Sequence, residues 1–88
     1  MKHPLEVEGF EGNLEGLAKA VGNMRYDKAR DFLGYLADDI MRQADADKGR
    51  GRVQLAERLY QTAERLYQAR EVMDLAWKIC EPYMKDSG

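Results

Sequence analysis

The chain has 88 residues with 16 acidic and 14 basic side chains, so its formal net charge is −2. Such a balance gives no overall attraction to nucleic acids or to anionic lipid surfaces. Cys80 is the only cysteine and His3 the only histidine, which excludes an intramolecular disulfide and a histidine-rich metal site. A free thiol is typical of a reducing compartment. With neither a secretory leader nor about 18 consecutive apolar residues, we expect a soluble, cytoplasmic protein.

The length predicts a single helical domain over residues 1–88. Chains this short bury only about 60% of the surface that they expose when unfolded. Their cores are usually supplemented by disulfides, a metal or oligomerisation. Because the composition argues against the first two, we expect oligomerisation.

The N-terminal region predicts an extended arm followed by a short helix. Residues 1–12 carry Pro4 and two glycines among acidic side chains, which is typical of extended chain. From about 13–22, apolar residues recur at the three- and four-residue spacing of one helical face. Asn13 is the expected N-cap, and Gly22 with Asn23 is expected to end the helix in the left-handed conformation.

A second, longer helix is predicted over about 26–47, because its apolar side chains fall on one face and its charged side chains on the other. The carboxylates of Asp45 and Asp47 lie at the negative end of this helix, where we expect fraying. Two glycines within residues 48–51 predict a turn short enough to return the next helix antiparallel.

The third helix, over about 52–81, is the strongest prediction. The hexapeptide Ala-Glu-Arg-Leu-Tyr-Gln occurs at 56–61 and again at 63–68, one heptad apart. Such a repeat keeps one apolar seam facing a partner helix. The predicted seam consists of Leu55, Leu59, Thr62, Leu66, Ala69, Met73, Ala76 and Cys80. Pro82 ends the helix, and 83–88 is predicted to be a polar tail.

The predicted fold is therefore all-α: a short helix followed by a long antiparallel helical hairpin, resembling a three-helix bundle and pairing into a helical-bundle homodimer. The end of the third helix is apolar on two sides, because Val72, Leu75 and Ile79 point away from the seam. Either the first helix and the arm cover this second side, or a second subunit does.

Two tyrosines, Tyr60 and Tyr67, edge the predicted seam one heptad apart. They either lie over the rim of the core with their hydroxyls in water or take part in an interface between subunits. The candidate interface residues are Leu55, Leu59, Tyr60, Leu66, Tyr67, Leu75 and Ile79.

Arg70 is the one charged side chain within the apolar arc of the third helix. A guanidinium there must be paired or must extend to solvent. The expected arrangement is a structural ion pair with Asp39 or Asp74, and the alternative is an anion or ligand site.

No catalytic, cofactor-binding or metal-binding motif is recognisable, and we expect no enzyme activity. Cys80 has no nearby histidine in the sequence to activate it, and Asp45 to Gly49 begins like a calcium loop without its closing glutamate. The strongest basic cluster comprises Lys48, Arg50 and Arg52, which are candidate nucleic-acid contacts.

The function predicted from these features is a small protein–protein interaction module, an adaptor or regulator, that binds a second copy of itself and, in addition, another protein. A regulator that contacts nucleic acid through the basic turn from Lys48 to Arg52 is the alternative. A small enzyme relying only on carboxylates ranks third.

Overall fold

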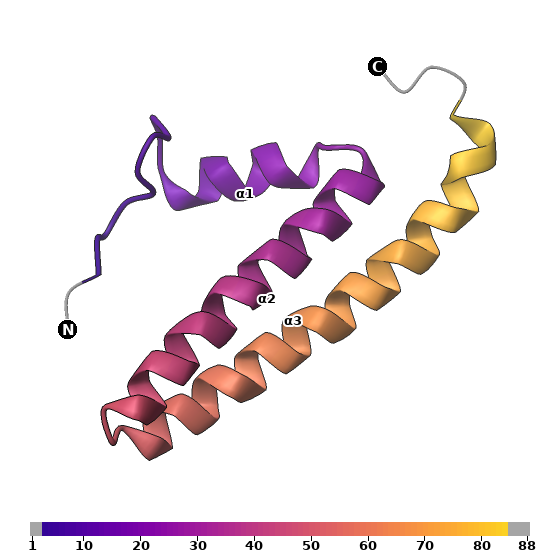
Figure 1. The fold of residues 1–88 in the computed structure, drawn as a ribbon. Coiled ribbons are helices and arrows are strands. Elements are labelled where there is room, and N and C mark those ends of the chain that lie inside the picture. Colours follow the sequence, from indigo (N-terminus) through magenta and orange to yellow (C-terminus); the bar gives the residue numbers. More distant parts are fainter. Residues whose placement is uncertain (1–2, 85–88) are drawn as a thin grey trace.

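The computed structural model describes residues 3–84. Its elements are three α-helices and a short 3-10 helix, namely α1 (Leu14–Gly22), α2 (Tyr26–Gly49), α3 (Val53–Cys80) and η1 (Glu81–Tyr83). The two long helices pack against each other as an antiparallel hairpin, as Figure 1 shows. The predicted all-α fold, with a short helix before a long helical hairpin, is thus confirmed.

Local capping explains where α1 begins. The side chain of Asn13 accepts a hydrogen bond of 2.7 Å from the backbone N–H of Gly16, as an N-cap does. The helix ends at Gly22, as expected, but not through a left-handed residue. Asn23 at the C-cap has a φ of −85°, and its backbone N–H bonds to the carbonyl groups of Lys19 and Val21.

The turn between the long helices is closed by one acidic residue. Gly51 takes the left-handed conformation, with a φ of 82°. The backbone N–H of Arg52 then donates to the carbonyl of Asp47 at 2.8 Å, and its guanidinium pairs with the Asp47 carboxylate at 3.0 Å. This pair holds the end of α2, so the helix continues to Gly49 instead of fraying at Asp47.

The seam between α2 and α3 is lined by alanine. Each long helix contributes two alanines one heptad apart, and all four have at most 1% of their surface exposed: Ala37, Ala44, Ala56 and Ala63. Small side chains let two helix backbones approach closely, and a seven-residue spacing keeps them in register along the pair. The core of this protein is therefore a strip of methyl groups.

The seam predicted from the leucines of the third helix is wrong in its orientation. Thr62 and Ala69, which that prediction places in the seam, are exposed. The observed seam is rotated toward Ala56 and Ala63, because alanines stand at the matching positions of α2. Leu55, Leu59 and Leu66 consequently lie beside the seam and are only half-buried.

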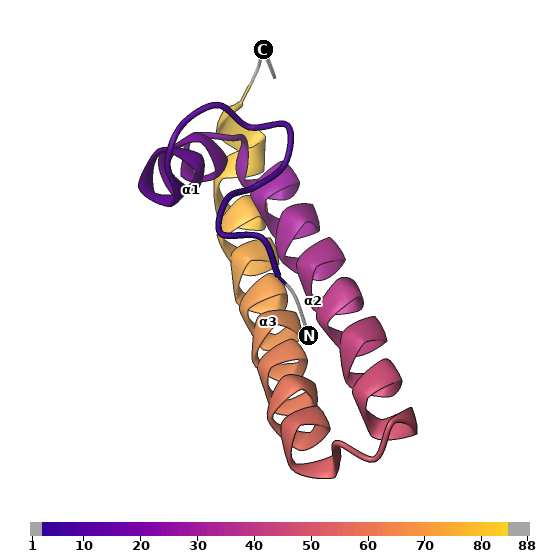
Figure 2. The same cartoon turned by 90° about the vertical axis from the view of Figure 1, so that its left-hand side faces the viewer.

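No element covers the hairpin along its length. Among residues 3–84, α1 contacts only α2, and Figures 1 and 2 show it leaving the hairpin crosswise at the open end. The preceding arm is exposed from residue 3 to residue 9, and Phe10 is its one half-buried apolar side chain. The radius of gyration is 15.6 Å, compared with about 12 Å for a compact chain of this length. The protein is thus elongated.

No helix within residues 3–84 combines the length and the apolar character needed to cross a lipid bilayer.

Candidate functional site

The repeated hexapeptide of α3 gives the hairpin two different flanks. Each copy places its alanine in the seam. The leucine and the tyrosine that follow lie on opposite sides of the seam, because successive residues of a helix differ by about 100° in direction. Leu59 and Tyr60 form the first such pair, and Leu66 and Tyr67 the second. We call the tyrosine side the polar flank and the leucine side the apolar flank.

The polar flank is held together by two hydrogen bonds between the long helices. The hydroxyl of Tyr60 donates to the carboxylate of Asp45, and one heptad along the hairpin the hydroxyl of Tyr67 donates to Asp38. Both aspartates directly follow a seam alanine of α2. These bonds favour the protonated phenol, so they raise the pKa of Tyr60 and Tyr67 above the ordinary tyrosine value, assisted by desolvation and by the carboxylate charge.

Arg70 occupies the next position of the alanine heptad, after Ala56 and Ala63. Its guanidinium carbon lies 4.9 Å from the centre of the Tyr67 ring, a cation–π distance. No ion pair of the described residues includes Arg70, so the predicted pair is not formed. Asp39 instead binds Arg42 and Gln43, and Asp74 binds two other cations.

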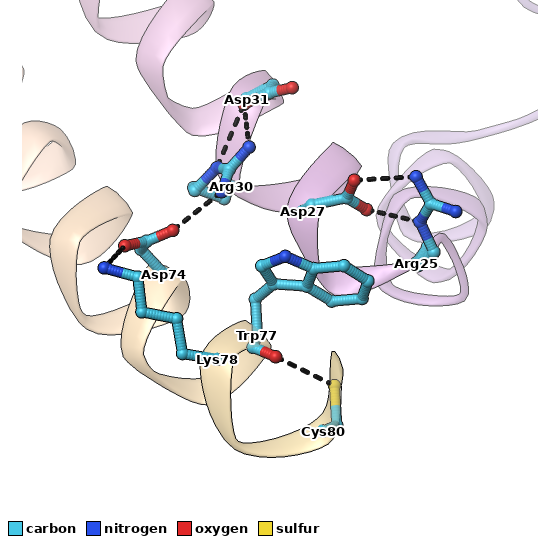
Figure 3. A network of polar contacts seen from close by, with 8 residues as sticks. All are labelled: Arg25, Asp27, Arg30, Asp31, Asp74, Trp77, Lys78 and Cys80. Atoms are coloured by element: carbon cyan, nitrogen blue, oxygen red, sulfur yellow. Dashed lines mark hydrogen bonds and ion pairs between the residues drawn. The ribbon is translucent and has the colours of Figure 1, made fainter. Parts of the chain in front are cut away.

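Those cations are Arg30 and Lys78. The Arg30 guanidinium reaches across from α2 to the Asp74 carboxylate at 2.7 Å, and the Lys78 ammonium lies 3.0 Å from its other oxygen (Figure 3). The hydrogen bond from Arg30, followed by that from Lys78, lowers the pKa of Asp74 below its ordinary value against the effect of desolvation. The Arg30–Asp74 ion pair therefore connects α2 to α3 between Tyr67 and the open end of the hairpin.

The open end of the hairpin is fastened by Arg25. Its guanidinium makes two hydrogen bonds to Asp27, of 2.7 and 2.8 Å, and lies 5.2 Å from the centre of the Trp77 ring (Figure 3). The Cys80 thiol donates to the Trp77 carbonyl at 3.5 Å. Arg25 therefore connects the start of α2 to the end of α3.

The apolar flank has no comparable closure. It consists of seven large apolar side chains: Leu33, Leu36, Ile40, Leu55, Leu59, Leu66 and Met73. Leu36 is 38% exposed, and the other six are half-buried. Among residues 3–84 no large side chain is fully buried, because the seam alanines take the innermost positions. The hairpin therefore presents a continuous apolar surface along one side.

A third group of apolar side chains lies on the outer part of α3. Val72, Leu75 and Ile79 are 60–74% exposed. Within the described residues, α1 and the arm do not cover them, which corrects the expectation of cover from these segments. The second possibility, cover by another subunit, stays a prediction.

The predicted interface residues are thus distributed over three surfaces. Leu55, Leu59 and Leu66 lie on the apolar flank. Tyr60 and Tyr67 lie on the polar flank and are engaged within the chain. The remaining two, Leu75 and Ile79, belong to the exposed outer part of α3. Sequence reasoning missed the partners on α2, although the Ala-Asp pairs at 37–38 and 44–45 repeat at the same heptad spacing.

The basic turn is partly neutralised. Of the three candidate nucleic-acid contacts, Arg52 is engaged with Asp47, whereas Lys48 and Arg50 are exposed. Arg50 and Arg52 line a shallow hollow with His3, Arg42, Gln43, Ala46 and Asp47. The hollow contains one carboxylate, and Arg42 is itself paired with Asp39.

No group of three or more histidine, cysteine, aspartate or glutamate side chains is placed to hold a metal ion within residues 3–84. Comparisons with models of known protein families, with curated proteins and with solved structures found no match. The candidate functional site is therefore defined by geometry alone, and it is the apolar flank.

Proposed function

We propose that this protein is a helical protein–protein interaction module, an adaptor or regulator that acts by binding rather than by catalysis, and that its binding surface is the apolar flank. The observation that carries the proposal is the seam of four alanines. It leaves the seven large apolar side chains of the apolar flank beside the seam, on a surface that no described element covers along its length. Large exposed apolar patches mark interaction sites in soluble proteins.

The proposal also agrees with how polar groups are distributed. The polar flank satisfies its tyrosines and aspartates internally, and a surface already bonded to itself has little left to offer a partner. The apolar flank has the opposite character. An apolar surface between two helices is a typical site for a further helix, which supplies its own apolar face.

Capture from an extract of the cells that contain this protein tests the binding surface. The wild-type chain is compared with Leu36→Glu and Leu66→Glu on the apolar flank, and with Leu75→Glu on the outer part of α3 as the matched control. We expect a saturable set of captured proteins that the two flank variants lose and the control retains. Loss by Leu75→Glu alone would place the binding surface elsewhere.

A function in the cytoplasm fits a binding module with a free thiol, and we keep it as part of the proposal. The alternative, contact with nucleic acid through Lys48, Arg50 and Arg52, stays a prediction. The pairing of Arg52 with Asp47 leaves fewer free cations at the turn than the sequence indicated.

A further inference from the structure

A partner that covers the apolar flank must be long enough to follow most of the hairpin. Its residues extend from Leu55, beside the turn, to Met73, well toward the open end. At 1.5 Å per residue, this stretch of α3 is about 27 Å long. A small ligand covers only part of such a length, whereas another helical hairpin covers all of it.

The exposed area of this chain exceeds that of a compact monomer. A compact monomer of 10.1 kDa has an accessible surface of about 5,300 Å² by size scaling. This chain exposes 7151 Å², about 1,850 Å² more than the scaling gives. The extended arm accounts for part of the excess. Stable interfaces bury about 800 Å² per partner, and permanent homodimers bury about 1,000–2,500 Å² per partner. The excess is sufficient for a permanent dimer.

The chemistry of the flank permits two copies to meet. Self-association through one surface places like residues of the two copies near each other, so a charge in the middle of that surface would meet its own copy. The seven flank residues are uncharged. Arg70 continues the heptad of the seam alanines, but it extends over Tyr67 toward the polar flank, where it lines a hollow with Arg30, Glu71, Asp74 and Leu75.

The core itself favours a copy over an unrelated partner. The buried apolar residues of the described chain are all alanines, and burial of methyl groups alone stabilises a hairpin weakly. A chain with so small a core gains stability from a partner that is present whenever it folds. A second copy of the same chain fulfils this condition, because it is made at the same place and in the same amount.

We propose that two copies of this chain stack apolar flank against apolar flank into a four-helix bundle, with α2 and α3 of each copy forming one shared core. This inference rests on the proposed function and names the partner of that same surface. The leucines, Ile40 and Met73 become the large core side chains that the single hairpin lacks. The polar flanks with their tyrosines face outward on both sides of the bundle.

Sedimentation and light scattering of the purified full chain test the inference from low to high micromolar concentration. We expect the mass of a dimer, together with an unfolding midpoint that rises with protein concentration, as coupled folding and association requires. Leu36→Glu and Leu66→Glu place two carboxylates per dimer in the shared core. Each should raise the dissociation constant at least about a hundredfold. Leu75→Glu and Tyr35→Glu, at more exposed positions, should leave the dissociation constant unchanged.

The outcomes separate this inference from the proposed function. A wild-type chain that is monomeric at high micromolar concentration, with a midpoint independent of concentration, overturns the dimer. If that monomer still captures partners through the apolar flank, the proposed function stands without it. A dimer that Leu75→Glu dissociates and Leu36→Glu does not would also overturn the inference. Should the flank variants fail to fold, the concentration dependence of the wild-type midpoint decides.

Discussion

Arg70 on α3 lies directly against Gly34 on α2. A Cβ atom at position 34 would stand 2.9 Å from the Arg70 Cδ and 3.0 Å from its Nη1. Because Arg70 continues the heptad of Ala56 and Ala63, its side chain crosses the seam and would be displaced by a larger residue at position 34. At this level of the hairpin the seam therefore consists of a glycine on α2 and an arginine on α3, whereas elsewhere both helices contribute alanines.

This relationship predicts how the two residues depend on each other. Gly34→Ala should change the free energy of unfolding by less than about 1 kcal/mol, because the gain in helix propensity offsets the displaced cation–π contact. In an Arg70→Ala background the same change should stabilise by about 1 kcal/mol. Urea unfolding of the four-member cycle at one protein concentration measures both values. Gly49→Ala, with open space around it, serves as the reference, and equal effects in both backgrounds would contradict the coupling.

The alanine seam should not tolerate larger side chains. Ala44 and Ala63 are fully buried, so Ala44→Leu or Ala63→Leu forces the helices apart and should lower the free energy of unfolding by about 1–3 kcal/mol. Ala46→Leu, two residues from Ala44 at an exposed position of α2, is the control and should have little effect. Thermal and urea unfolding provide the measurement. Comparable stability of all three variants would argue against a close-packed seam.

The tyrosine–aspartate bonds predict a loss of stability at alkaline pH. Their formation raises the folded-state pKa of Tyr60 and Tyr67 above the unfolded value of about 10. The associated stability is complete below that unfolded value and disappears as the pH rises through the raised pKa. The variant with Tyr60→Phe and Tyr67→Phe should lack this part of the alkaline decline, whereas Tyr35→Phe should keep it. Urea midpoints on both sides of the tyrosine range give the comparison.

Asp74 predicts the opposite dependence at acidic pH. Hydrogen bonds from Arg30 and Lys78 lower its folded-state pKa, so its contribution is present above the unfolded value of about 3.9 and disappears as the pH falls through the lowered pKa. Asp74→Asn should therefore reduce stability at neutral pH and flatten the acid decline. Glu71→Gln, at an exposed neighbouring position, is the control. An acid profile unchanged by Asp74→Asn would show that the carboxylate is not engaged in solution.

The helices of this protein could be predicted from sequence because each is marked by local signals. The cap at Asn13, the glycines of the turn and Pro82 place the ends of α1 and α3 within about two residues, which is the usual uncertainty of helix boundaries. The tail predicted over 83–88 overlaps η1 at Tyr83, and residues 85–88 lie outside the described part of the chain.

The side of α3 that packs against α2 could not be predicted from the sequence of α3 alone. When α3 is considered alone, its leucines are assigned to the seam, because burial of a leucine gains more free energy than burial of an alanine. The choice of Ala56 and Ala63 depends on alanines at the matching positions of α2, which is a property of the pair. The same holds for Arg70, whose place is decided by Gly34 on the other helix. Information of this kind appears only when the two patterns are aligned antiparallel.

The heptad that orders the hairpin also makes its length adjustable. One repeat of the pair consists of Ala-Asp on α2 and of alanine with its Leu-Tyr pair on α3, and Tyr60–Asp45 and Tyr67–Asp38 are two successive copies. Removing one heptad from each long helix would join equivalent positions within α2 and within α3, so the two helices would still face each other in register. The shortened chain would keep its turn, its open end and the character of both sides. The protein is in this sense modular, with a rod whose span can change without redesign of its ends.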